Sequence, residues 1–97
     1  MKSKKIRDAA RGQECIRCGS PDAYACHYNG EMQHWYGKGR GVKCSDLATA
    51  EFCYACDQLF SEGNNIYHDK VERSEMFLHF ILMTNIRRFN NGVLKVG

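Results

Sequence analysis

The sequence has only one proline and no long apolar run, and each of these features excludes a class of protein. A single proline in 97 residues, 43% of them hydrophobic, excludes a proline-rich disordered chain and indicates one globular domain spanning residues 1–97. The longest apolar segment, "MFLHFILM", is far shorter than the ~20 residues that span a bilayer, so we expect no contact with a membrane. The first residues include no apolar stretch typical of a secretory signal, so we expect a cytoplasmic protein.

The net charge is also small. Its formal value is +3, which does not by itself predict a polyanionic partner. The basic residues are nevertheless unevenly placed, with one group near the N-terminus and another in a glycine-rich loop. Clustered positive charge attracts phosphate backbones, but a solvated face that aids solubility explains such clusters equally well. The two groups are Lys2, Lys4, Lys5, Arg7 and Arg11, and Lys38, Arg40 and Lys43.

The pattern of apolar and turn residues predicts an α+β domain with the order helix, strand, strand, helix, helix. A loop with four glycines is expected between the two strands, over residues 29–43. The predicted helices cover 4–12, 54–63 and 69–89, the strands 23–28 and 48–52, and a short strand or extended tail 93–96. One face of the long helix is expected to carry Val71, Phe77 or Leu78, Ile81, Leu82, Asn85 and Phe89.

Six cysteines in a cytoplasmic protein need an explanation other than disulfides, because thiols stay reduced there. Four of them form two C-x2-C pairs, Cys15 with Cys18 and Cys53 with Cys56, separated by residues 19–52. This spacing turns both thiolates of a pair toward one ion, and two pairs complete the tetrahedron that zinc prefers. Four sulfur ligands leave no open position, so we expect a structural zinc site. Thiol redox chemistry is less favoured, because no thioredoxin-like βαβ pattern accompanies the pairs.

The segment between the two pairs contains two further cysteines and His27. Cys26 and Cys44 are most simply interpreted as small buried hydrophobes, with Cys26 as a substitute metal ligand the alternative. His27, in "AYACHYNG", is either a half-buried strand histidine bonded to the backbone or a general base, since an imidazole titrates near neutral pH.

A cysteine pair, a strand that ends in histidine, a glycine-bearing loop and a second C-x2-C at a helix start resemble the plan of HNH, or ββα-metal, nucleases. More closely, "IRDAARGQEC", "CHYNG", "GRGVKCSDL", "CYACD" and "RRFNNGVLKV" resemble the small prophage-encoded nuclease family typified by YbcO. The resemblance runs in order from about Ile6 to Val96. It implies a small zinc-stapled ββα-metal domain with an additional N-terminal helix and a long C-terminal helix.

The resemblance also implies an activity, namely a metal-dependent DNA endonuclease in phage or prophage recombination or DNA processing, in the cytoplasm of a bacterial host. His27 matches the general base of the family. Asp57, where the family usually has histidine, matches a ligand of a catalytic Mg²⁺ or Mn²⁺ ion. The residue before the base is often aspartate or histidine but is here Cys26, a soft ligand poorly suited to magnesium. His34, Asp46 or substrate phosphates would then have to complete the metal site.

The loop "MQHWYGKGRGVK" is the predicted contact with nucleic acid, because glycines let the backbone approach phosphates and aromatic rings stack on bases. A surface loop without a ligand is the alternative. The departures at Cys26 and Asp57, with the apolar "MFLHFILM", also favour a second hypothesis, a non-catalytic zinc module that binds nucleic acid or a phage or host recombination protein. A monomer and a homodimer both remain open. The predicted nucleic-acid contacts are His34, Lys38, Arg40 and Lys43.

Overall fold

The computed structural model describes residues 2–30, 32–39, 43–60 and 69–94. Its elements are α1 (Lys4–Ala10), β1 (Tyr24–His27), the 3-10 helix η1 (Gln33–Tyr36), β2 (Thr49–Phe52), α2 (Tyr54–Leu59) and α3 (Lys70–Asn90). This order confirms the predicted succession of helices and strands, with η1 added inside the predicted loop. Within the described ranges, no helix combines the length and the apolar character needed to cross a membrane.

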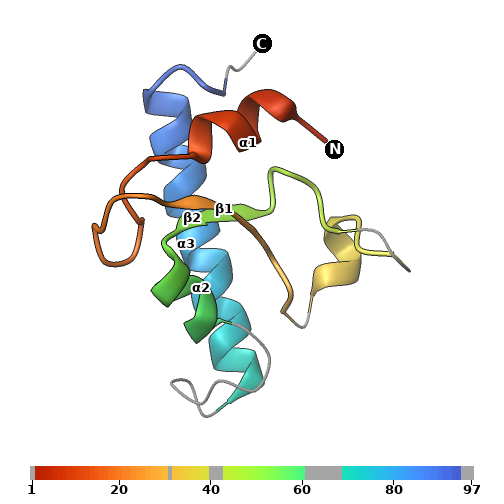
Figure 1. Ribbon diagram of the computed structural model, residues 1–97. Helices are drawn as coiled ribbons and strands as arrows, with labels where there is room; N and C mark the ends of the chain where they lie inside the picture. The colour runs from red at the N-terminus through yellow and green to blue at the C-terminus, as the bar shows by residue number, and fades with distance from the viewer. Residues whose placement is uncertain (1, 31, 40–42, 61–68, 95–97) are drawn as a thin grey trace.

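The two strands form an antiparallel sheet in which Tyr24 pairs with Phe52 and His27 pairs with Thr49. Figure 1 shows this sheet crossing α3 near the middle of the helix, with α1 on one side of the sheet and α2 on the other. The chain is therefore α+β, as the sequence predicted. The layout matters for the site, because β1 runs between the two short helices.

Local signals place the helix ends close to their predicted positions. The side chain of Ser3 accepts a hydrogen bond from the amide of Ile6 at the start of α1, and Asp69 accepts one from Val71 at the start of α3. Gly12, just after α1, has a φ of 79°, a conformation that favours glycine. The predicted end of the second helix, 61–63, lies outside the described residues. For the short strand or extended tail predicted at 93–96, Val93 and Leu94 lie in no strand, and 95–96 lie outside the described residues.

Aromatic rings from three elements make the centre of the core. Phe52 of β2 stacks on Phe60 just after α2, with ring centroids 4.9 Å apart, and both lie against Phe77 of α3, at 5.4 and 5.2 Å. Tyr28 meets Phe77 edge-on, and its hydroxyl is hydrogen-bonded to Ser74. Burying each ring contributes roughly 2 kcal/mol, so this cluster joins β2, α2 and α3.

The buried face of α3 differs from the predicted one. Phe77 and Ile81 are buried as expected, but Leu82 is 61% exposed. Every residue of β2 is buried, and its polar residues need polar partners on the helix that covers them. Polar residues of α3 therefore occupy part of the buried face, and Leu82 lies outside it. Val71 and Phe89 are also exposed, while the buried positions of α3 are Ser74, Phe77, Ile81, Thr84 and Arg88.

A buried ionic network joins β2 to α3. Glu51, only 2% exposed, accepts a 2.6 Å hydrogen bond from Arg87 and lies 3.6 Å from the Nε of Arg88. Arg88 donates to the hydroxyl of Thr49 and to the side-chain oxygen of Asn85, both at 2.9 Å. Each charge therefore has a partner, and removing one would leave the other buried with less compensation.

We expect Arg88→Met to lower the free energy of unfolding by roughly 3 kcal/mol, because Glu51 would lose one of its two cationic partners in a dry environment. Urea unfolding of the metal-loaded protein measures this. Lys70→Met, which removes one positive charge at the exposed start of the same helix, should change stability by only about 0.5 kcal/mol. Equal losses in the two variants would show that the buried pair is not what stabilises this contact.

Candidate functional site

The first cysteine pair lies on a tight backbone turn between α1 and β1. The amide of Cys15 donates to the carbonyl of Ser20 at 2.7 Å, and the amide of Gly19 donates to the carbonyl of Cys15 at 2.9 Å. Gly19 has a φ of 79°, which a side chain would disfavour. The amide of Ile16 donates to the carbonyl of Glu51, so the turn is bonded directly to β2.

The second cysteine pair lies at the start of α2. Cys53 is the residue before the helix and Cys56 is in its first turn. The four sulfurs all lie within 4.8 Å of one another, and those of Cys18 and Cys53 are 3.6 Å apart. A tetrahedral zinc ion with Zn–S bonds of ~2.3 Å needs sulfurs roughly 3.8 Å apart, so the cluster has the dimensions of a metal site. The prediction that the two pairs converge is confirmed.

The thiols of this cluster are electrostatically unequal. The hydroxyl and the amide of Ser20 lower the pKa of Cys18 to about 6, whereas burial raises the pKa of Cys56 to about 12, against a hydrogen bond from Arg17. Thiolates this close repel one another, so the four sulfurs can all be ionised only around a cation. Four soft sulfur donors are the set that zinc prefers, and the residues present therefore fit that ion.

His27, the last residue of β1, is paired with Asp46. Its Nε2 lies 2.8 Å from the Oδ1 of Asp46, a residue only 3% exposed. The other oxygen of Asp46 accepts from the amide of Ser3 at 2.5 Å and lies 3.4 Å from the Nε of Arg7. Although burial opposes the charge, the amide of Ser3 and the imidazole of His27 hold the pKa of Asp46 below its ordinary value.

This pairing decides which nitrogen of His27 can accept a proton. An ionised carboxylate only accepts hydrogen bonds, so the Nε2 of His27 carries hydrogen and donates to Asp46. In the neutral ring, Nδ1 then keeps its lone pair. His27 was predicted from the sequence, and Asp46 was considered there as a metal ligand but not as its partner, because no local pattern links positions that the fold brings together from β1 and the turn before β2.

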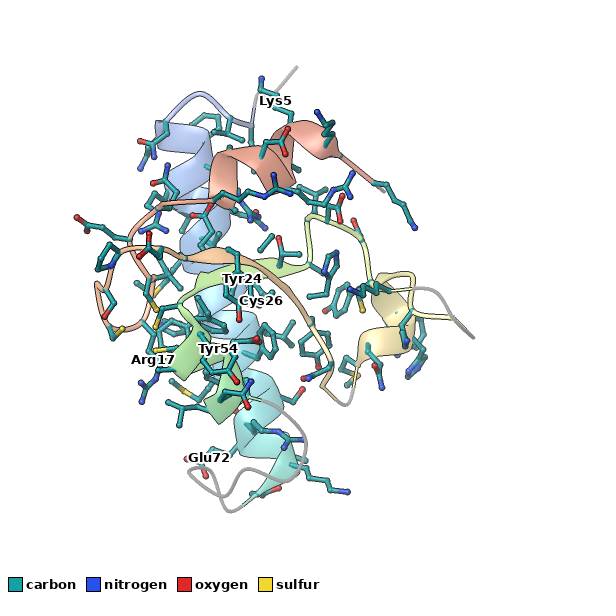
Figure 2. All side chains as sticks on the ribbon, viewed as in Figure 1. Lys5, Arg17, Tyr24, Cys26, Tyr54 and Glu72 are labelled. Atoms are coloured by element: carbon teal, nitrogen blue, oxygen red, sulfur yellow. The ribbon has the colours of Figure 1, made fainter. Side chains whose placement is uncertain are left out.

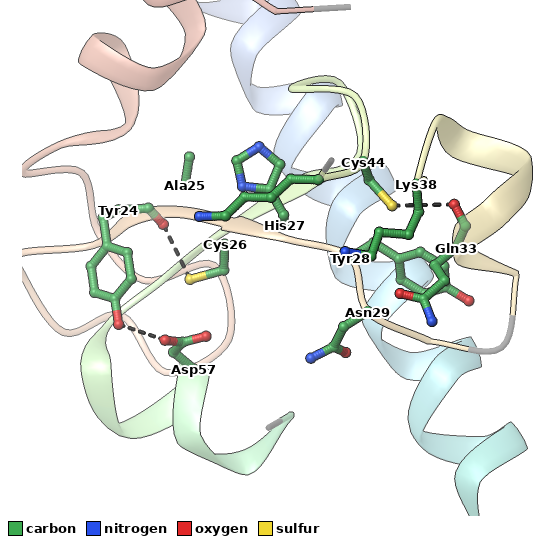
Figure 3. A pocket seen from close by; sticks show the side chains of 11 residues that line it. Tyr24, Ala25, Cys26, His27, Tyr28, Asn29, Gln33, Lys38, Cys44 and Asp57 are labelled. Atoms are coloured by element: carbon green, nitrogen blue, oxygen red, sulfur yellow. Dashed lines mark hydrogen bonds between the residues drawn. The ribbon is translucent and has the colours of Figure 1, made fainter. Parts of the chain in front are cut away.

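Asp57 lies on the other side of β1. Its Oδ2 accepts a 2.7 Å hydrogen bond from the hydroxyl of Tyr24, and Figure 3 shows Tyr24 and Cys26 reaching toward Asp57 while His27 leaves the opposite face of the strand. Burial, and next the charge of Asp57, raise the pKa of the Cys26 thiol, which therefore stays neutral. As the sequence predicted for Cys26 and Cys44, both are buried in the core.

Two clefts meet at His27. The α2-side cleft, of about 330 Å³, contains Asp57, Asn29 and Lys38, and the α1-side cleft, of about 310 Å³, contains Asp46 and basic residues of the N-terminal segment. His27 is thus open to both clefts and lies on the wall between them. The residues that line both clefts are Tyr24, Ala25, His27, Lys43 and Cys44.

The structure separates the predicted nucleic-acid contacts. Lys38 and Lys43 line the clefts beside His27. His34 lines neither cleft and lies beside Trp35, with ring centroids 5.5 Å apart. Arg40 lies outside the described residues. Sequence reasoning noted the N-terminal basic group but did not place it next to His27, because only the tertiary fold brings α1 against β1.

In the described part of the chain, Asp57, the predicted ligand of a catalytic ion, does not lie in a cluster comparable to that of the cysteines. Among the described residues, Cys15, Cys18, Cys53 and Cys56 are the cluster of three or more ligands close enough to hold an ion, and Asp57 belongs to no such group. Asp57 offers one carboxylate, already bonded to Tyr24, beside the neutral thiol of Cys26.

We expect the wild-type protein to bind one zinc ion and Cys53→Ser to lose tight zinc binding, because one of four sulfur ligands is gone. Titration against a chromophoric chelator measures the affinity, and circular dichroism follows unfolding on zinc removal. Cys44→Ser, the same exchange at a buried cysteine outside the cluster, should still bind one ion. Loss of zinc in both variants, or in neither, would contradict the assignment.

Asp46→Asn should cost about 2 kcal/mol of stability at neutral pH, because charged hydrogen bonds to His27 and Ser3 are weakened. The folded pKa of Asp46 lies below its ordinary value of 3.8, so its contribution is complete above pH 3.8 and is lost as pH falls through the folded pKa. Urea unfolding at a series of pH values should show the gap between the two proteins closing below pH 3.8. A difference in stability that stays constant with pH would contradict this. As a control, Asp8→Asn, at an exposed ion pair, should change stability by only about 0.5 kcal/mol.

Comparison with known proteins identifies no relative, because no family model, curated protein or solved structure matches this chain. The resemblance to the YbcO-like nucleases therefore rests on the sequence motifs.

Proposed function

We propose that this protein is a zinc-stapled HNH-type endonuclease of the YbcO-like kind, which hydrolyses phosphodiester bonds of DNA with His27 as general base. The observation that carries the proposal is the 2.8 Å contact between His27 and the buried Asp46, on the wall between two basic clefts. A carboxylate that orients an imidazole beside a positively charged hollow is an arrangement suited to proton abstraction near a phosphate.

The order of elements around the cysteine cluster supports the same proposal. A histidine ends the first strand, the second strand pairs with it in antiparallel fashion, and the second cysteine pair begins the helix that follows. A ββα-metal domain would have the same parts in the same order. Zinc, bound by the four cysteines, would have a structural role because its coordination sphere is filled by sulfur.

In the proposed reaction, Nδ1 of His27 takes a proton from a water molecule as the water oxygen forms a bond to phosphorus. The bond from phosphorus to the leaving sugar oxygen breaks, and that oxygen takes a proton from solvent. Asp46 stabilises the imidazolium that forms and keeps the ring in the required orientation. Lys38 and Lys43 are placed to bind the phosphate oxygens, because both line the cleft that contains His27.

Asp57 would hold a magnesium or manganese ion together with water and the substrate. When bound, such an ion supplies positive charge to the transition state and to the leaving oxygen. The hydrogen bond from Tyr24 orients the carboxylate of Asp57 toward the cleft that both residues line.

A non-catalytic zinc module is the second candidate, and a separate feature favours it. An apolar groove of about 630 Å³ runs between η1 and α3, where Trp35 is 74% exposed and Leu82 61% exposed. Exposed apolar surface of this kind often marks a protein–protein contact. It includes no residue of the His27 clefts, so a zinc module could bind a partner protein through the groove without any catalytic role for His27.

Cleavage of supercoiled plasmid by the zinc-loaded protein tests the proposal. We expect nicking with magnesium or manganese, and a rate at least about 100-fold lower in His27→Ala, because a general base contributes that much or more. His79→Ala, the same exchange at an exposed histidine of α3 that lines neither cleft, should stay close to the wild-type rate. Bound zinc and the unfolding midpoint are measured for each variant to show that the fold is retained.

Cleavage by His27→Ala at the wild-type rate would rule out His27 as the base. A wild-type protein that binds DNA in a salt-dependent manner but cleaves none under either metal would favour the non-catalytic module.

A further inference from the structure

The α1-side cleft contains more positive charge than its own residues neutralise. Lys2, Arg7, Arg11 and Lys43 line it, and Asp46 is the one carboxylate among its lining residues in the described part of the chain. That carboxylate already bonds to His27 and the amide of Ser3 and lies next to Arg7. The cleft therefore has a net positive charge and is suited to an external anion.

Three of the four cations of this cleft come from the basic N-terminal group, namely Lys2, Arg7 and Arg11. Arg7 and Arg11 are four positions apart and so project from the same side of the chain as it leaves α1. Lys4 and Lys5 belong to the same helix but do not line the cleft. Figure 2 shows Lys5 on the far side of α1 from Tyr24, a residue of the cleft wall. The sequence alone does not distinguish these two subsets.

The two clefts lie on either side of His27, and each has its own cations. Lys38 belongs to the α2-side cleft, Lys2 and Arg11 to the α1-side cleft, and Lys43 to both. A single free phosphate would occupy only one of these hollows. An anion whose charge repeats along its length would occupy both, with one charge beside His27 and the next among the N-terminal cations.

We infer that the α1-side cleft is a binding subsite for a phosphate next to the one that is cleaved, so that a nucleic-acid strand passes across β1 from one cleft to the other. The inference rests on the proposed function, because that function places the reacting phosphate at His27. Lys2 and Arg11 bind the neighbouring phosphate. Arg7 contacts Asp46 and Ser3 through its Nε. Its terminal N–H groups therefore bind the same neighbouring phosphate.

The test compares two double variants that each remove two positive charges from the same segment. Lys2→Gln/Arg11→Gln changes the cleft, whereas Lys4→Gln/Lys5→Gln does not, and each pair includes one of the two cationic partners of Asp8. Binding of a fluorescent duplex oligonucleotide to the zinc-loaded protein is measured by anisotropy over a range of salt concentrations, without added magnesium or manganese. Zinc content and the unfolding midpoint confirm that both variants are folded.

We expect the cleft variant to bind roughly tenfold more weakly at low salt and to reduce the slope of log K against log salt by about 2, because two phosphate contacts are lost. The control variant should keep the wild-type slope. Equal losses in both variants would overturn the subsite, since they would show a general effect of charge. An unchanged cleft variant would overturn it as well.

Two further arms separate this inference from its alternatives. Saturable binding of inorganic phosphate with an affinity equal to that of the oligonucleotide would show a site for free phosphate and overturn the strand model. The cleavage assay is run in parallel on the same proteins. Loss of binding by the cleft variant, in a protein that cleaves nothing, would support binding of a nucleic-acid phosphate in the α1-side cleft and reject the nuclease, and with it the cleaved phosphate at His27. Normal binding by that variant, in a protein that cleaves through His27, would reject the subsite alone.

Discussion

The convergence of four sulfurs from two distant segments determines where the functional side chains lie. Cys15 and Cys18 precede β1, and Cys53 and Cys56 follow β2, so the cluster closes one end of the two-stranded sheet. The same end has Tyr24 paired with Phe52, and the other end has His27 paired with Thr49. A shift of one residue in this register would move every side chain of β1 to the opposite face, and His27 would then point toward α2 instead of Asp46.

Polar contacts in the interior reinforce the same register. Thr49 and Glu51 are buried on β2 and are matched by Arg88 and Thr84 on α3, because a buried polar group is costly unless it is bonded. Asp46 has a corresponding role at the edge of the sheet, where it bonds to His27 and to the start of α1. The position of the proposed base thus depends on both the cysteine cluster and the N-terminal segment.

Local patterns predicted much of this fold. The pattern of apolar and turn residues and the spacing of the cysteines act over a few residues, so they can be recognised without the structure. The buried face of α3 could not be predicted in the same way. Arg88 is charged and would normally be exposed, and only the buried Glu51 on a distant strand explains its position.

The candidate site shows the same division. His27 and the four cysteines were predicted, because their residue types and spacing indicate their chemistry. The partnership with Asp46 and the cations of the α1-side cleft come from a turn and a helix far from β1 in the sequence. Asp57 was also selected in advance, but its bond to Tyr24 and its place across the strand from His27 required the structure.

The tautomer of His27 in the zinc-loaded protein, measured from the nitrogen chemical shifts of its imidazole by NMR, tests most directly whether this histidine can act as the proposed base. We expect the neutral ring to carry its hydrogen on Nε2, donated to Asp46, with Nδ1 as the basic nitrogen. A neutral ring with hydrogen on Nδ1 would rule out this role, because the nitrogen assigned to take a proton from water would already be protonated.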